Sequence, residues 1–373
     1  MHFTLHLTND CNMACRYCYV DGTNKSTMSF DTIIKSVDLA AKIGGESIGI
    51  IFFGGEPLLH KDLIYKTVEY CKNKEKGSEY CFHYKVTTNG LLLDEEFLNY
   101  SLKENIFIAL SFDGIKDAHD ANRVDKNQAG TYLKLIDKLD TLIKARPYAP
   151  VLMVISPNTV DYYADSVMFL YQKGYKYIIC SLDYSGNWTD QNMKALKREY
   201  KKLAQFYLEK TLLEEKFYFS PFEVKISSHI NCENYSSERC ELGKKQISVA
   251  PDGCLYPCVQ FVGKPYYSIG NVETGIDENK RQELFLTNEE EKVSCAQCAV
   301  RKRCNHYCGC LNLQTTGSID LVSPVLCAHE RIVMPIADKL AEKLFKKRNA
   351  MFIQKHYNDV FPLISLIEDK TNN

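Results

Sequence analysis

The sequence predicts an α/β fold, in which a partial parallel barrel of six strands precedes a cysteine-rich region organised around metal and a set of C-terminal helices. From residue 3 to about 215, apolar runs bounded by turn residues alternate with amphipathic stretches, the pattern of parallel strands joined by helices. From Cys232 to Cys327 this periodicity is lost and most of the sixteen cysteines appear. Helical periodicity then returns at 328–368. The expected domains are the barrel at 1–220, the cysteine-rich domain at 221–330 and the C-terminal helical segment at 331–373.

Apolar runs rich in β-branched and aromatic residues predict the six strands at 3–7, 47–53, 81–88, 106–112, 151–156 and 176–182. Amphipathic stretches predict intervening helices at 29–44, 94–104, 131–145 and 160–174, and a lysine-rich helix is expected near 190–216. Several begin at a Ser, Asp or Thr that can cap a helix, and two end at glycine. Because ligands collect at the carboxyl ends of parallel strands, we expect the chemistry there.

Length and charge exclude several classes of function. A chain of 373 residues can form two to three domains with a sizeable core and needs no disulfides to fold. Its net charge of -1 offers no field for nucleic acid or an anionic membrane. Without a basic, apolar leader or a run of about 18 apolar residues, we expect a soluble, cytoplasmic protein. In that reducing compartment the cysteines indicate metal ligation rather than disulfides.

Three cysteines follow the first predicted strand with the spacing C-x3-C-x2-C, namely Cys11, Cys15 and Cys18, and the aromatic Tyr19 comes next. Three thiolates bind three irons of a [4Fe-4S] cube and leave the fourth iron open to a ligand, whereas an electron-transfer cluster normally takes four cysteines. A structural zinc site would need a fourth nearby Cys or His, and unliganded core cysteines are a further alternative. The spacing favours a catalytic cluster over zinc.

This motif resembles the signature of the radical S-adenosylmethionine superfamily, with Tyr19 as a cofactor contact. Gly54, Gly55, Glu56 and Pro57, after the second strand, match the family's Gly-Gly-Glu motif. The resemblance implies that their backbone and the Glu56 carboxylate hold the ammonium of S-adenosyl-L-methionine, since paired glycines permit close approach. It also implies that one electron from the cube splits the sulfonium bond, and that the 5'-deoxyadenosyl radical abstracts a substrate hydrogen.

Further polar residues follow other predicted strands. The stretch SFDG at 111–114 is similar to the family's ribose or carboxylate contact, with Ser111 the expected donor. Thr88 and Asn89 end the third strand as pocket lining or as turn-formers, and we favour the turn. Asp183 and Tyr184, after the sixth strand, are candidates for substrate contact or proton removal, and Asp183 is the candidate catalytic base. Turn formation is the simpler interpretation of an aspartate at this point.

The C-terminal cysteines match a second pattern, the SPASM extension, which includes Gly253 five residues before a cysteine. An additional cysteine upstream lies where fully ligated relatives, such as anaerobic sulfatase-maturating enzymes, have another ligand. Eight thiolates fit two [4Fe-4S] cubes, and a pair of zinc ribbons is the weaker alternative. The resemblance implies that auxiliary cluster I takes Cys232, Cys240, Cys258 and Cys308, and that auxiliary cluster II takes Cys295, Cys298, Cys304 and Cys327.

Five cysteines remain outside these sets. Cys71, in a predicted helix, and Cys81 and Cys180, in apolar strands, are expected to be small core residues. Cys254 and Cys310 each lie within four residues of a ligand assigned to auxiliary cluster I. Either could replace that ligand, because the assignment rests on spacing alone.

SPASM enzymes mostly modify peptides or proteins, so the resemblance implies a maturase. Sulfatase-maturating relatives carry an aspartate base directly after the cysteine that matches Cys258, where this chain has Val259. They also tend to have glutamine before Gly-Gly-Glu, where this chain has Phe53. Valine cannot accept a proton. We therefore expect a thioether or carbon-carbon crosslink in a ribosomally synthesised peptide, with formylglycine formation as the alternative.

Two other hypotheses are a non-catalytic iron-sulfur electron carrier, which the open-site motif disfavours, and a small-molecule enzyme of the same superfamily. Many peptide maturases have an N-terminal leader-binding domain, but this chain reaches its first strand at about residue 3. We therefore expect a separate leader-recognition protein, or the barrel itself, to bind the leader. A reductant such as a flavodoxin or ferredoxin is the other expected partner.

Overall fold

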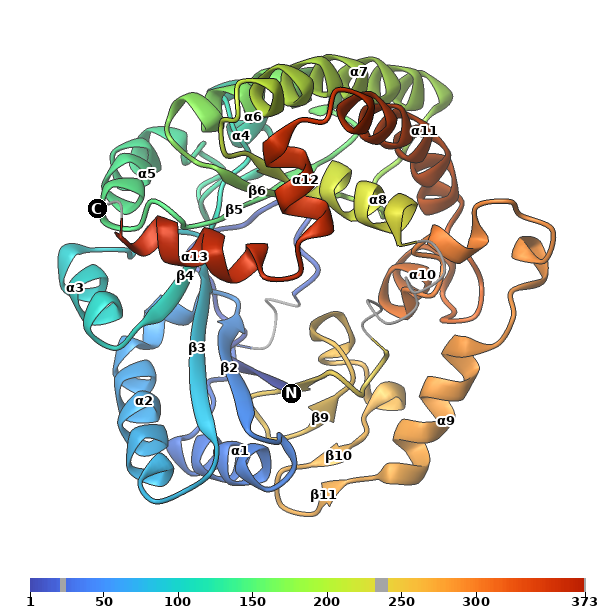
Figure 1. Ribbon diagram of the computed structural model, residues 1–373. Helices are drawn as coiled ribbons and strands as arrows, with labels where there is room; N and C mark the ends of the chain where they lie inside the picture. The colour runs from blue at the N-terminus through green and yellow to red at the C-terminus, as the bar shows by residue number, and fades with distance from the viewer. Residues whose placement is uncertain (21–24, 232–240, 372–373) are drawn as a thin grey trace.

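The six expected strands form one continuous parallel sheet in the computed structural model, which describes residues 1–20, 25–231 and 241–371 (Figure 1). Each strand pairs with the next one along the chain, which confirms the α/β partial barrel. All six carboxyl ends therefore lie at the same edge of the sheet. The strands are β1 (His2–Thr8), β2 (Ser47–Gly54), β3 (Cys81–Thr88), β4 (Ile106–Ser111), β5 (Val151–Ile155) and β6 (Tyr177–Leu182).

Short strands that the sequence did not predict extend both edges of the sheet. β7 (Tyr218–Phe219) pairs with β6. At the other edge β8 (Gln246–Val249) runs parallel to β1, and β9 (Leu255–Tyr256) is antiparallel to β8. Because β8 and β9 belong to the cysteine-rich region, main-chain hydrogen bonds attach that region to the strand that leads into the first cysteine motif. The small hairpin of β10 (Gly270–Asn271) and β11 (Gly275–Ile276) lies outside this sheet.

Helices surround the barrel on its outside, and Figure 1 shows them as a ring around the strands. Two of the expected caps are present, because Ser29 and Asp94 each accept a hydrogen bond from the first turn of their helix, and Thr189 caps the lysine-rich helix in the same way. Thr131 makes no such bond and instead donates to the carbonyl oxygen of Arg123 at 2.8 Å. The helices are α1 (Phe30–Ile43), α2 (Lys61–Glu75), α3 (Glu95–Lys103), α4 (Lys116–Asn122), α5 (Tyr132–Ala145), α6 (Tyr163–Gln172), α7 (Asp190–Leu212) and α8 (Ser220–Ile230).

The strands have two different faces, and β3 shows the alternation most clearly. Phe82, Tyr84 and Val86 are buried in the core beneath the helices. Lys85 and Thr87 point to the opposite face and are only partly buried. Burial lowers the pKa of Lys85. The inside of the barrel therefore contains polar side chains and remains partly accessible, as a substrate-binding space requires.

The C-terminal segment packs back on the barrel as expected. α11 (Pro324–Lys346) lies against α7 and α8, and α12 (Ala350–Tyr357) and α13 (Phe361–Thr371) follow it (Figure 1). Lys216 attaches α13 to the barrel through an ion pair with Asp369 at 2.7 Å. The cysteine-rich region contributes α9 (Glu278–Glu289) and α10 (Gly309–Thr316). In the described parts of the chain, no helix combines the length and the apolar character needed to cross a bilayer.

Candidate metal centres at the strand ends

The first cysteine motif lies in the loop that leaves β1. Cys11 and Cys15 are half-buried, and Cys18 is exposed. Burial raises the pKa of Cys11 to about 12, and the nearby thiols of Cys15 and Cys18 act in the same direction. In residues 1–20, 25–231 and 241–371, no three Cys, His, Asp or Glu side chains converge closely enough to hold one metal ion. In a cube each thiolate binds a different iron, so its ligands need not converge on one point.

Backbone hydrogen bonds clamp this cysteine loop to the segment that follows α4. The N–H of Ala14 donates to the carbonyl oxygen of Val124 at 2.8 Å, and that of Arg16 donates to Asn122 at 2.9 Å. The loop is therefore held at alternate residues as a strand would be, although it has no regular secondary structure. Fixed backbone positions between the cysteines keep the three thiols in a defined arrangement before any metal binds.

A buried charge network supports the same loop from below. Asp113 is 2% exposed, and its Oδ1 accepts a hydrogen bond from the N–H of Val154 at 3.0 Å. Its Oδ2 accepts a 2.5 Å hydrogen bond from Tyr17 and forms a 3.1 Å ion pair with Arg123. The Arg123 guanidinium also lies over the Tyr17 ring, 5.5 Å from its centre. The positive charge lowers the pKa of Cys15, opposing the larger effect of burial.

The paired glycines of the second motif lie against the start of the cysteine loop. A Cβ on Gly54 would lie 2.3 Å from the carbonyl oxygen of Thr8, and one on Gly55 would lie 2.1 Å from that of Asp10. The N–H groups of Gly55 and Glu56 donate to these two carbonyl oxygens at 2.8 and 2.9 Å. Both positions therefore require glycine, because a side chain at either would keep the segment after β2 from packing against the segment after β1.

Glu56 is fully buried and uses its carboxylate within the protein. Oε1 accepts hydrogen bonds from Thr88 Oγ1 at 2.7 Å and from the N–H of Leu58 at 3.0 Å. Oε2 accepts one from the N–H of Asn89 at 2.8 Å. Burial raises the pKa of Glu56 to about 7 even though these hydrogen bonds lower it. Glu56 therefore joins the ends of β2 and β3, with Pro57 buried behind it in a short 3-10 helix. Its contact with the S-adenosylmethionine ammonium stays a prediction.

Asn89 does more than form the turn after β3. Its Oδ1 accepts a hydrogen bond from the N–H of Leu91 at 3.0 Å, which is the expected turn contact. Its Nδ2 donates to Asn12 Oδ1 at 2.7 Å and approaches Cys11 Sγ at 3.6 Å. An amide donor beside a thiolate stabilises the negative charge, and hydrogen bonds to sulfur are one means by which proteins set cluster potentials.

The other predicted polar residues lie at the same edge of the sheet. Ser111 is the half-buried last residue of β4. Asp183 directly follows β6, where its Oδ1 accepts a hydrogen bond from Ser185 Oγ at 2.7 Å and its carbonyl oxygen accepts one from Trp188 Nε1 at 2.6 Å. These are the contacts of a turn-forming aspartate. Tyr184 is buried, and its hydroxyl meets His329 Nδ1 at 2.9 Å.

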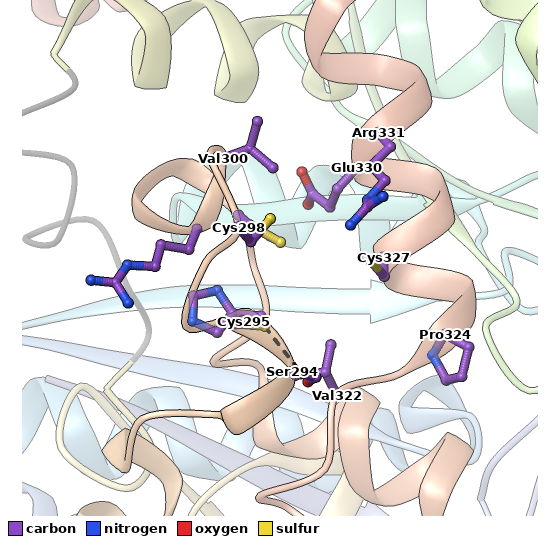
Figure 2. A pocket seen from close by; sticks show the side chains of 12 residues that line it. Ser294, Cys295, Cys298, Val300, Val322, Pro324, Cys327, Glu330 and Arg331 are labelled. Carbon is purple, nitrogen blue, oxygen red and sulfur yellow. Dashed lines mark hydrogen bonds between the residues drawn. The ribbon is translucent and has the colours of Figure 1, made fainter.

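The cysteines assigned to auxiliary cluster II line one cavity of about 200 Å³ (Figure 2). Cys295, Cys298 and Cys304 come from the irregular segment after α9, and Cys327 lies in the first turn of α11. One turn further along α11, the buried Glu330 lines the same cavity and forms an ion pair with Lys225 at 2.7 Å. Four thiols around one cavity are the donor set that a cube needs.

The cysteines assigned to auxiliary cluster I are described only in part, because Cys232 and Cys240 lie outside the described residues. Cys258 is buried at the end of the short segment after β9, and Cys308 immediately precedes α10. A third thiol lies with them, since Cys310 Sγ is 3.3 Å from Cys308 Sγ and Cys258 is close enough to raise the pKa of Cys310. The side chain of Tyr19 stays 42% exposed although its hydroxyl is within electrostatic reach of Cys18, Cys258 and Cys310.

A family model described as the radical SAM superfamily matches residues 5–170, which include the cysteine loop, the Gly-Gly-Glu turn and the first five strands. These residues belong to the radical SAM superfamily. Membership implies S-adenosylmethionine and a [4Fe-4S] cluster as cofactors, and the thiol donors of the cysteine loop fit that cluster. With its cysteine-rich region attached to the barrel by β8, the protein is a radical SAM/SPASM enzyme.

Relatives of this radical SAM chain support that assignment. A cysteine-type anaerobic sulfatase-maturating enzyme of Clostridium novyi is 24% identical over 330 residues, which cover 81% of this chain and 85% of that protein. The solved structure of anSMEcpe with bound AdoMet and Cp18Cys peptide has a TM-score of 0.78 at 20% identity, covering 92% of this chain and all of that one. SuiB of Streptococcus suis, bound to precursor peptide SuiA, has a TM-score of 0.60 at 14% identity, covering 87% and 75%. At these identities the two structures establish the shared fold.

The structure corrects one expectation about the remaining cysteines. Cys71 is buried in α2 as expected, and Cys180 is half-buried against Met153. The expectation that Cys81 is a core residue is wrong, because Cys81 is the exposed first residue of β3. Its Sγ lies 3.4 Å from the Nε2 atom of His83. The alternation along β3 places position 81 on the accessible face, and an apolar run alone does not reveal which of its residues face outward.

Sequence reasoning also missed Asp113, Arg123 and Tyr17. Asp113 lies inside the SFDG motif, in which Ser111 is the predicted cofactor contact, and Tyr17 lies between two of the cysteines. Both offered a signal, because each lies within a motif already singled out. Arg123 offered none, since its role depends on the fold bringing α4 beneath the cysteine loop.

Replacing Arg123 by methionine should lower the free energy of unfolding by about 3–5 kcal/mol, because the buried Asp113 carboxylate loses its counter-ion. Asp113→Asn in the same chain should recover part of the loss by removing the uncompensated charge. Lys134→Met is the matched control, since its ion pair with Asp125 is solvent-exposed at the lysine and should contribute little. Anaerobic thermal or denaturant unfolding measures all three. Equal stability of the Arg123 and Lys134 variants would contradict the proposed network.

Proposed function

We propose that this enzyme is a peptide maturase that installs a crosslink, through a thioether or a carbon-carbon bond, in a ribosomally synthesised peptide. The fold is shared with anSMEcpe, described with a bound Cp18Cys peptide, and with SuiB, described with its precursor peptide. Both of those proteins thus take peptides at this fold. The barrel interior is partly accessible, and the cysteine loop lies at the carboxyl edge of the sheet. A peptide segment could therefore enter from that edge.

The observation that carries the choice of reaction is Val259. It follows Cys258 directly and begins the 3-10 helix Val259–Phe261. The next side chain, Gln260, is an amide, so neither residue can accept a proton from an oxidised substrate. Formylglycine formation needs such a base for the oxidised residue. In a thioether crosslink the adenosyl radical takes one hydrogen atom, the second hydrogen leaves as the acidic proton of the substrate thiol, and its electron would pass to a proposed auxiliary cluster. Asp183 is the candidate base that the sequence offers instead, but its Oδ1 accepts a hydrogen bond from Ser185 in a turn.

In the proposed mechanism, Cys11, Cys15 and Cys18 hold the cluster that supplies an electron for cleavage of S-adenosylmethionine and hence for hydrogen abstraction from the substrate. The chain contributes position and environment. Asn89 donates toward Cys11, Arg123 places a positive charge near Cys15, and Glu56 holds together the strand ends where the cofactor is expected to bind. The eight SPASM cysteines are proposed to hold two auxiliary [4Fe-4S] clusters.

Two partners follow from this proposal. A reductant such as a flavodoxin or ferredoxin supplies the electron that the cluster passes on. A separate leader-recognition protein, or the barrel itself, selects the precursor peptide. Both belong to the same hypothesis of a peptide maturase, and neither is needed to test which product forms when a chemical reductant is used.

Product mass distinguishes the two reactions. We expect the reduced enzyme to convert a short cysteine-bearing peptide encoded beside its gene to a product lighter by two hydrogens, with one fewer free thiol if sulfur takes part. A sulfatase-motif peptide should react at least about a hundredfold more slowly, the usual cost of a missing general base. Formylglycine from cysteine loses sulfur and reacts with hydrazides, so mass spectrometry with hydrazide labelling separates the products. Efficient formylglycine formation would refute the proposal and point to Asp183 as the base.

A carbon-carbon crosslink would leave every thiol free and would decide between the two crosslink types. The control is the Cys15→Ala variant, which should modify neither peptide. If the sulfatase peptide alone reacts, the enzyme belongs with the sulfatase-maturating branch in activity as well as in fold.

A further inference from the structure

We propose that Cys310 is an iron ligand, which together with Cys258 and Cys308 holds the auxiliary cluster next to the barrel. The seven-cysteine SPASM pattern has no place for this residue, and spacing alone left it as an alternative. The inference rests on the proposed function to the extent that it assumes an auxiliary cluster in this region. It assigns three of the four iron positions of that cluster, so that one of the four cysteines that the SPASM resemblance gave to it is displaced.

Thiols from two distant segments lie close together at this point. Cys308 is the last residue before α10, and Cys310 is the second residue of that helix. Their Sγ atoms are 3.3 Å apart, and the thiol of Cys258, which follows β9, is close enough to Cys310 to raise its pKa. Cys310 thus contacts Cys308 and lies near Cys258. Any cluster large enough to bind Cys258 and Cys308 must lie beside its sulfur.

The arrangement is not explained by packing or by a disulfide. An S–S bond is about 2.05 Å long, so the 3.3 Å separation of Cys308 and Cys310 is a contact between free thiols. Thiols are weak hydrogen-bond donors and acceptors, and burying three together gains little beyond what apolar side chains would give. Metal binding deprotonates such thiols and stabilises the folded chain. The first turn of α10 adds a favourable partial positive charge for anionic ligands.

Cys254 provides the internal comparison. Cys254 lies four residues before Cys258, and Cys310 lies two residues after Cys308. Distance along the sequence therefore makes Cys254 as good a candidate for an iron ligand as Cys310. In the structure the Sγ of Cys254 meets the amide of Asn271 at 3.7 Å, and its N–H bonds the side chain of Asp252. A thiol between an amide and a carboxylate is a turn residue, and the carboxylate would oppose a thiolate there.

The position of the three thiols gives the assignment a functional meaning. The hydroxyl of Tyr19 is within electrostatic reach of Cys18, Cys258 and Cys310. Tyr19 therefore lies near both the first cysteine loop and the proposed auxiliary ligands. A cluster held by Cys310 is thus expected close to Tyr19, which is 42% exposed.

Iron content and spectroscopy of the full chain test the assignment without any peptide. We expect anaerobically reconstituted Cys310→Ala to bind about four fewer irons than the unaltered chain, since a cube is lost. One of the signals of the reduced clusters in electron paramagnetic resonance should disappear. Cys310→Ser should retain iron but shift that signal, because oxygen replaces sulfur at one iron. Cys254→Ala is the matched control and should keep both the iron and the spectrum.

Full iron content and an unaltered spectrum in Cys310→Ala would overturn the assignment, as would equal losses in the Cys254 variant. Cleavage of S-adenosylmethionine by Cys310→Ala shows that the barrel is folded and that the first cluster is intact. If the chain has no auxiliary clusters at all, the unaltered chain will bind only about four irons. That result is distinct from a wrong assignment of Cys310. Failure to crosslink a peptide would leave the iron measurements unaffected.

Discussion

Cys15→Ala is expected to abolish cleavage of S-adenosylmethionine. Three thiolates leave one iron of the cube open for the cofactor, and loss of one of them removes the geometry on which that open position depends. Cys15 is half-buried and lies within the electrostatic influence of Arg123, and the backbone on both sides of it is clamped at Ala14 and Arg16. The same outcome is expected for alanine at Cys11 or Cys18. Production of 5'-deoxyadenosine by the reduced protein measures it.

Cys81→Ala is the matched control for this experiment. Cys81 is an exposed cysteine at the opposite end of β3 from the carboxyl edge, so its loss should leave both the cluster and the cleavage rate unchanged. Cleavage by Cys15→Ala at the rate of the control would exclude the loop as the site of the catalytic cluster. Stoichiometric zinc in the purified protein would exclude a cube altogether.

Cys327→Ala should separate cleavage of the cofactor from modification of the substrate. The intact chain is expected to bind about twelve irons, three cubes of four, and the variant about eight. Cys327 lines the cavity of about 200 Å³ with three other thiols, away from the loop after β1. Formation of 5'-deoxyadenosine should therefore persist while the peptide product is lost. Iron analysis and mass spectrometry of the same preparation provide both readings.

Val322→Ala is the appropriate control because Val322 lines the same cavity without a ligand atom. It should keep about twelve irons and full turnover of peptide. If Cys15→Ala and Cys327→Ala lose cofactor cleavage equally, the proposed division of labour between the clusters is wrong. An iron content near four in the unaltered chain would contradict the three-cluster interpretation itself.

Much of the barrel follows from local patterns. Each of the six strands is an apolar run ended by turn residues, and their order in the sheet follows the order of the chain because neighbouring parallel strands are joined by helical crossovers. The first cysteine motif is equally local, since its three ligands occupy one loop. Such features are readable because the residues that act together are also close in sequence.

The contacts that complete the site depend on closure of the fold. Asp113 meets Tyr17 and Arg123 only because β4 and α4 lie beneath the cysteine loop. Asn89 reaches Cys11 only because β3 and β1 end at the same edge of the sheet. Periodicity shows that a face is buried, but it does not name the partner, because many distant segments offer an equally apolar surface.

The auxiliary cysteines show the same distinction most sharply. The resemblance to the SPASM pattern groups Cys295, Cys298, Cys304 and Cys327, and the structure brings those four around one cavity. Spacing cannot choose between Cys254 and Cys310, since both stand close to assigned ligands in the chain. The choice depends on where β9 and α10 come to rest. Their packing places Cys310 against Cys258 and turns Cys254 toward Asn271, because side-chain direction follows from the path of the backbone in three dimensions.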